Sequence, residues 1–146
     1  MSLIGKFRCL PPPERWLLLK AAGLLAVVRL ALKVFPFPAV RPLLHRVSRQ
    51  SPRLAVSPPP AAQLAWAVAT ASRFVPGAGH CLTQALAGHI LLARRGYPAT
   101  VCFGVLREPG ADFMAHAWVE YNGVAVIGGG HLDRYVRLTS PADSPF

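Results

Sequence analysis

The sequence predicts an α+β fold in which helices are followed by a small antiparallel sheet. Apolar residues recur at helical spacing as far as residue 95, whereas residues 100–106 and 115–121 alternate with a period of two. The pair Asn122-Gly123, which favours a two-residue hairpin turn, directly follows the second of these segments. Because 53% of the 146 residues are apolar and only 15% are charged, the chain has the apolar surface that a folded core requires.

Proline residues mark the helices of the amino-terminal region. A first helix is expected at residues 13–34, since proline suits a first helical turn, where its missing N–H has no partner to lose. Pro36 and Pro38 are expected to stop this helix. A short basic helix at 41–50 and a proline-rich linker at 51–60 complete the region.

Helix and strand patterns after the linker define the rest of the fold. Further helices are expected at residues 61–73 and 80–95, and a third strand at 124–127 continues the sheet as an antiparallel meander. The glycine run 128–130 is expected to end that strand, and residues 133–138 could form a last short one. The chain thus divides into a basic and apolar N-terminal helical region with its linker (1–60) and a core (61–146).

The basic balance of the chain, 16 Lys and Arg against 6 Asp and Glu, predicts attraction to polyanions. The cations are scattered among prolines and leucines without a nucleic-acid-binding motif, so nucleic acid is not an expected partner. The most apolar stretch, 16–35, is interrupted by Lys20, Arg29 and Lys33, which argues against a membrane span or a signal peptide. We expect a buried or interfacial helix there, and its lack of a broad polar face argues against docking on a membrane surface.

Cys81 is the candidate nucleophile. The three cysteines are too few and too irregularly spaced for a disulfide scaffold and indicate a reducing, cytoplasmic setting. Cys81 is the second residue of the helix predicted at 80–95, where unpaired N–H groups and the helix dipole favour a thiolate. The same N–H groups could stabilise an oxyanion. The alternative is that a lone cysteine packs as a small apolar residue, which is the expectation for Cys9 and Cys102.

His116 supplies the second candidate group. The alternation of residues 115–121 places His116, Trp118 and Glu120 on one face of a strand. A cysteine at a helix N-terminus, packed on a sheet that bears a histidine, recurs in cysteine hydrolases. Trp118 is expected to flank the imidazole.

Three segments resemble a known family: HCLTQAL at residues 80–86, RRGYPA at 94–99 and AHAWVE at 115–120. They are similar to the transglutaminase-like cysteine peptidases of lasso-peptide biosynthesis, which remove the leader from a ribosomally made precursor. The PPERW entry into the first helix is similar as well. The resemblance implies a papain-like core, in which a Cys-bearing helix packs on a small antiparallel sheet. It also implies a Cys-His-Asp triad with Cys81 and His116 at its first two positions.

The third triad position is not filled directly. The family's aspartate follows the histidine by about a dozen residues, which here falls in the glycine run 128–130, and a two-residue hairpin turn would set Gly129 opposite His116. Glu120 lies too far along the strand to orient the ring. Asp133 is the best remaining candidate, because the glycine run could return the chain toward the imidazole. A backbone carbonyl or a water molecule is the alternative.

The resemblance implies a stand-alone peptidase of the split type, which cleaves the leader from a lasso-peptide precursor through an acyl-enzyme and uses no cofactor. Its implied partners are the precursor, a separate small leader-binding protein and an ATP-dependent cyclase. The basic N-terminal region is the expected docking surface for the leader-binding protein or an acidic leader. Two alternatives stay open, a non-catalytic basic binding module and an acyl-transfer or crosslinking enzyme of the same fold. No metal is expected, since only His80 and Cys81, among the His and Cys residues near the candidate site, are close in sequence.

Overall fold

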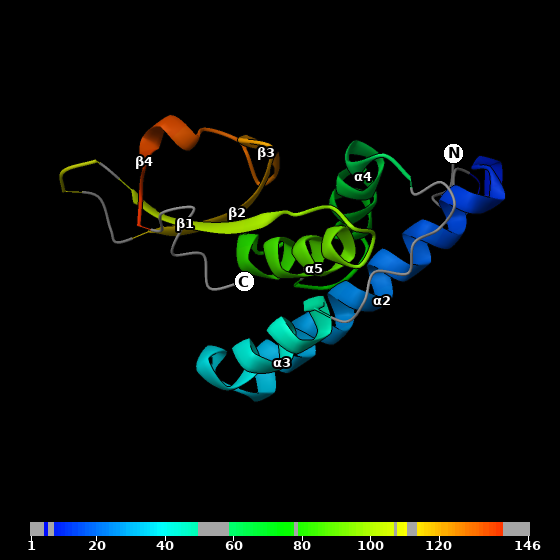
Figure 1. Ribbon diagram of the computed structural model, residues 1–146, viewed down its shortest axis with the longest axis horizontal. Coiled ribbons are helices and arrows are strands. Elements are labelled where there is room, and N and C mark those ends of the chain that lie inside the picture. Colours follow the sequence, from blue (N-terminus) through cyan, green and yellow to red (C-terminus); the bar gives the residue numbers. More distant parts are fainter. Residues whose placement is uncertain are drawn as a thin grey trace.

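Four α-helices precede a four-stranded antiparallel sheet in the computed structural model, which describes residues 5, 8–49, 59–77, 79–106, 108–110 and 114–138 (Figure 1). The predicted α+β class is confirmed. The helices are α2 (Pro12–Val34), α3 (Phe37–Arg49), α4 (Ala61–Ala71) and α5 (Cys81–Ala93), and the strands are β1 (Thr100–Leu106), β2 (Ala115–Tyr121), β3 (Val124–Ile127) and β4 (Tyr135–Arg137).

Prolines separate α2 from α3 differently from the prediction. Pro36 lies between the two helices, as expected. Pro38 does not end a helix, because α3 begins at Phe37 and contains it. Pro38 lies in the first turn of α3, where a missing N–H costs no helical hydrogen bond. The basic helix expected at 41–50 therefore begins four residues earlier, and most of the predicted linker, residues 51–58, lies outside the described part of the chain.

Helix α5 is the central element of the fold. It is apolar all around and residues 85–92 are buried, because α2 and α4 contact it on one side and β1 and β2 on the other. Gly88 allows a close approach to the sheet, since a Cβ atom there would collide with the end of the Ile127 side chain. One apolar core thus joins the N-terminal helices to the sheet; its largest fully buried side chains include Leu25, Leu64, Leu86, Leu92, Val101 and Val119.

The strand order is β3-β2-β1-β4, so β1, β2 and β3 form the predicted antiparallel meander. β4 pairs with β1 and not with β3. After β3 the chain passes through Gly128, whose φ is +72°, and a 3-10 turn at Leu132–Arg134 before reaching β4. In Figure 1 this connection arches over the face of the sheet opposite to α5.

Candidate functional site

Cys81 is the first residue of α5, one position closer to the helix start than predicted. His80 is the N-cap residue, and no side chain forms a capping hydrogen bond there. The first intrahelical bond runs from the Gln84 N–H to the His80 carbonyl (3.1 Å). The N–H groups of residues 81–83 therefore have no acceptor within the helix, which favours a negative charge at this end. Cys81 itself is half-buried and packs against the apolar core.

His116 is held by a backbone carbonyl. Its Nε2 atom lies 2.7 Å from the carbonyl oxygen of Gly128. A carbonyl oxygen only accepts hydrogen bonds, so Nε2 carries the proton and Nδ1 of the neutral ring keeps a free lone pair. The positive φ of Gly128 suits glycine, and a Cβ atom there would lie 3.0 Å from the Ala117 oxygen. The imidazole is thus oriented with Nδ1 available to accept a hydrogen bond.

Two aromatic rings flank the imidazole. Trp118 stacks on His116 with 5.9 Å between ring centroids and 22° between planes, which confirms the expected flanking position. Tyr135 of β4 lies on His116 as well, at 4.9 Å and 30°. Gly104 makes room for the indole, since a Cβ atom there would lie 3.0 Å from Trp118 Cζ3. These contacts restrict the rotation of the imidazole ring.

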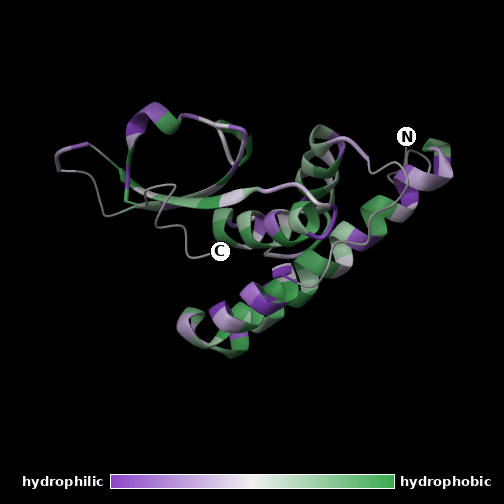
Figure 2. Ribbon diagram, in the orientation of Figure 1, coloured by the Kyte–Doolittle hydropathy of each residue, from purple (hydrophilic) through white to green (hydrophobic). Residues whose placement is uncertain are grey.

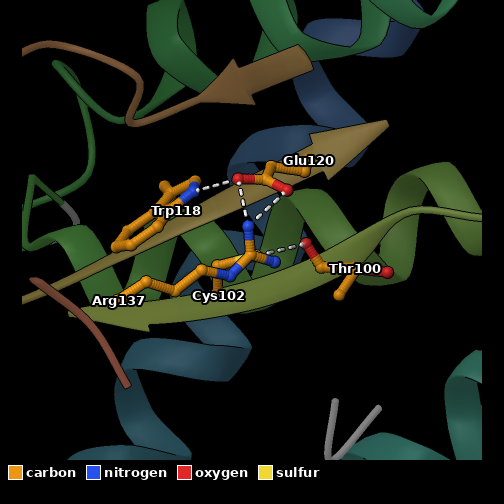
Figure 3. Close-up of polar contacts among 5 residues, drawn as sticks. All are labelled: Thr100, Cys102, Trp118, Glu120 and Arg137. Atoms are coloured by element: carbon orange, nitrogen blue, oxygen red, sulfur yellow. Dashed lines mark hydrogen bonds and ion pairs between the residues drawn. The ribbon is translucent and has the colours of Figure 1, made fainter. Parts of the chain in front are cut away.

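Trp118 is in turn fixed by an ion pair across three strands (Figure 3). Its Nε1 donates to Glu120 Oε1 (2.8 Å), and Arg137 Nη1 lies 3.0 Å from both carboxylate oxygens. Burial raises the pKa of Glu120, but the hydrogen bonds from Trp118 and Arg137 outweigh it and the pKa is lowered. As expected, Glu120 does not reach the imidazole ring. It accepts a hydrogen bond from the indole of Trp118, which stacks on that ring. We call Trp118, Glu120 and Arg137 the indole clamp.

Cys102 lies beside this clamp and is unsuited to nucleophilic chemistry. Arg137 Nη2 is 2.9 Å from its sulfur. Burial and, next, the charge of Glu120 raise the pKa of the Cys102 thiol to about 11. The thiol therefore stays protonated at neutral pH, in line with the packing role expected for it.

The structure puts Cys81 and His116 on elements that contact each other, α5 and β2, but on different sides of the sheet. Ala117 and Val119 belong to the apolar core that Cys81 also contacts. His116 alternates with them, so its side chain points to the opposite face, where Gly128 of the connection from β3 to β4 contacts it. Within the described part of the chain, no hydrogen bond joins the sulfur to the imidazole.

Asp133 lies in the 3-10 turn between β3 and β4 and is exposed. In the described residues it makes no hydrogen bond to His116, whose Nε2 is occupied by Gly128. The prediction that Gly129 lies opposite His116 is wrong, because a bulge between Val119 and Glu120 shifts the register of β3. Asp133 as the third triad member stays a prediction.

The sequence did not indicate Gly104, Tyr135 or Arg137 as parts of the site. The last two belong to β4, and their role depends on its pairing with β1, which residue spacing does not reveal. Gly104 carries a local signal, because glycine interrupts an otherwise apolar strand where a large side chain crosses it. Across the described residues, no group of three or more His, Cys, Asp or Glu side chains could hold a metal ion.

The chain belongs to the transglutaminase-like superfamily, whose family model matches residues 22–140. No curated protein and no solved structure matches it. Members of this superfamily are generally cysteine peptidases or transglutaminases. In both activities a cysteine sulfur attacks a carbonyl and forms an acyl-enzyme.

Proposed function

We propose that this protein is a cysteine peptidase that cleaves the leader from a lasso-peptide precursor, with Cys81 as nucleophile and His116 as general base. The observation that carries the proposal is the position of Cys81 as the first residue of α5 in a member of the transglutaminase-like superfamily. The tautomer of His116 supports it, since the ring offers Nδ1 to accept the thiol proton.

The reaction balances with these groups alone. His116 Nδ1 takes the proton of the Cys81 thiol, and the thiolate attacks the carbonyl carbon of the peptide bond between leader and core. The N–H groups at the start of α5 stabilise the oxyanion. The imidazolium then protonates the departing core amine, which leaves the leader as a thioester on Cys81. Water, deprotonated by the same imidazole, releases the leader as a carboxylate and restores the thiol.

Catalysis requires Nδ1 of His116 to reach the sulfur of Cys81. In the free protein these two side chains lie on different sides of the sheet, so a rearrangement must precede the proton transfer. We propose that the bound precursor brings the start of α5 and β2 into that arrangement. Such a step fits the split arrangement, in which a separate leader-binding protein delivers the precursor and an ATP-dependent cyclase uses the new α-amine.

The experiment is mass spectrometry of a precursor peptide incubated with this protein, with and without the leader-binding partner. Cleavage by the wild type and by Cys9→Ala, but not by Cys81→Ala, is the expected result, because Cys9 is an exposed cysteine that is not part of α5. Cleavage by Cys81→Ala at the wild-type rate would overturn the proposal and favour a non-catalytic module. Transfer of the leader to an added amine in preference to water would identify an acyl-transfer enzyme.

A further inference from the structure

Helix α2 presents a second apolar face to solvent. Its inner face, which includes Leu18, Leu25 and Val28, is buried, and the helix packs on α4 and α5. On the opposite side apolar residues recur at spacings of three and four, with exposed fractions of 65% at Val27 and 62% at Leu30. We call this stripe the outer face of α2; it consists of Trp16, Leu19, Gly23, Val27, Leu30 and Val34.

The outer face is long and continuous. The 23 residues of α2 span about 35 Å at the usual helical rise. Most of this helix is green in Figure 2, although one side of it is exposed. Soluble proteins rarely expose contiguous apolar surface of this extent unless it contacts something. An exposed apolar face of this length is typical of an interaction surface.

Lysines border the outer face on both sides. At 100° per residue, Lys20 lies along one edge of the stripe and Lys33 along the other. The ammonium group of Lys20 lies 5.7 Å from the centroid of the Trp16 ring. Glu14 is the one acidic residue in α2, and it lies outside the outer face. Apolar centre and cationic borders together match a surface that offers both hydrocarbon and negative charge.

We infer that the outer face of α2 docks the protein on an anionic lipid surface, with the helix lying in the plane of the interface. A convex helix face can sink its aliphatic side chains into the acyl boundary, while Lys20 and Lys33 extend their stems toward the headgroups. Trp16 at one end suits the interfacial layer. A second copy of the chain is a poor occupant, because each copy carries a net charge of +10.

In the sequence alone, the lack of a broad polar face on α2 argued against docking on a membrane. In the folded chain this lack does not count against docking. An isolated amphipathic helix needs a broad polar face, because its other side faces water. Here the other side of α2 is buried against α4 and α5. The polar counterpart of the outer face is the rest of the protein. No helix in the described ranges is long and apolar enough to cross a membrane, so the contact proposed is a surface contact.

The test is co-sedimentation of the full chain with vesicles of phosphatidylcholine alone or mixed with phosphatidylglycerol. Net charge alone would draw this protein to anionic vesicles, so two variants of equal charge are compared. Leu30→Glu alters the outer face, and Leu138→Glu alters an equally exposed leucine after β4 (62% and 63% exposed). We expect binding to the mixed vesicles that is about tenfold weaker in Leu30→Glu than in Leu138→Glu. Lys20→Gln and Lys33→Gln should each weaken it about fivefold.

Tryptophan emission gives a second readout. In Trp66→Phe the remaining indoles are Trp16, 63% exposed, and the buried Trp118. A blue shift on addition of mixed vesicles would therefore report Trp16 entering the interface. Equal binding of the two glutamate variants, or no vesicle binding at all, would overturn the inference. If the wild type does not bind vesicles, and Leu30→Glu but not Leu138→Glu fails to bind the leader-binding protein, the outer face would be assigned to a protein partner instead.

Discussion

The backbone carbonyl of Gly128 holds Nε2 of His116 at 2.7 Å, the contact that a carboxylate makes in a Cys-His-Asp triad. Gly128 follows His116 by 12 residues, within the glycine run where the resemblance to lasso-peptide peptidases places the aspartate. A carbonyl fixes the tautomer and direction of the ring as a carboxylate does, but it is uncharged. In the proposed mechanism, the main chain of Gly128 would therefore take the orienting role of that side chain.

Gly128→Ala is expected to lower the rate of precursor cleavage about 100-fold, because misplacing a catalytic group by about 1 Å has an effect of that size. The new Cβ atom would lie 3.0 Å from the Ala117 oxygen at a φ of +72°, so the carbonyl must move away from His116. Gly130→Ala is the matched control, since nothing lies within 4 Å of its Cβ position. Cleavage rates are compared by mass spectrometry, and equal rates for the two variants would contradict the orienting role of Gly128.

Asp133→Asn is expected to retain full peptidase activity, because Gly128 already occupies the nitrogen of His116 that a triad aspartate would bind. The side chain of Asp133 is exposed, so the substitution should leave stability unchanged within about 0.5 kcal/mol. The measurement is kcat/KM for precursor cleavage. A loss of tenfold or more at unchanged stability would restore Asp133 as the third catalytic group.

Sequence patterns predicted the strands β1, β2 and β3 without error, because alternation and the Asn122-Gly123 turn are local signals. They failed where tertiary pairing decides the structure. The partner of β4 is set by the path through residues 128–134, and the register of β3 by a bulge, neither of which follows from spacing. The local positions of Cys81 and His116 were enough to select them as candidates. They did not show which face of the sheet each residue would occupy.

Two substitutions of Glu120 test the hydrogen bond and the ion pair of the indole clamp separately. Glu120→Gln keeps an oxygen to accept from Trp118 but loses the charge that Arg137 pairs with, whereas Glu120→Ala loses both. We expect each variant to lower the free energy of unfolding, by about 1–2 kcal/mol for Gln and more for Ala. If the clamp positions Trp118 against His116, Ala should also shift the pH profile of cleavage and Gln should not.

The stability of the clamp is expected to depend on pH in acid. The pKa of Glu120 is lowered in the folded protein, so its contribution is complete above the unfolded value of about 4.3 and is lost as pH falls below it. Urea unfolding of the wild type and Glu120→Gln should therefore differ at neutral pH and converge in acid. A difference that is unchanged on acidification would show that Glu120 acts through packing alone.

His89 is expected to make the fold less stable below neutral pH. Burial in α5 lowers its pKa, which a backbone hydrogen bond with Ala99 opposes and the charge of His45 reinforces. Near pH 6.5 the unfolded chain then binds a proton that the folded chain does not. The free energy of unfolding therefore decreases as the pH is lowered, by at most about 1.4 kcal/mol per pH unit. His89→Gln removes this uptake and should flatten the pH dependence seen in urea unfolding, even if it lowers stability throughout. The exposed His80, changed to Gln, is the control. An undiminished slope in His89→Gln would contradict the assignment.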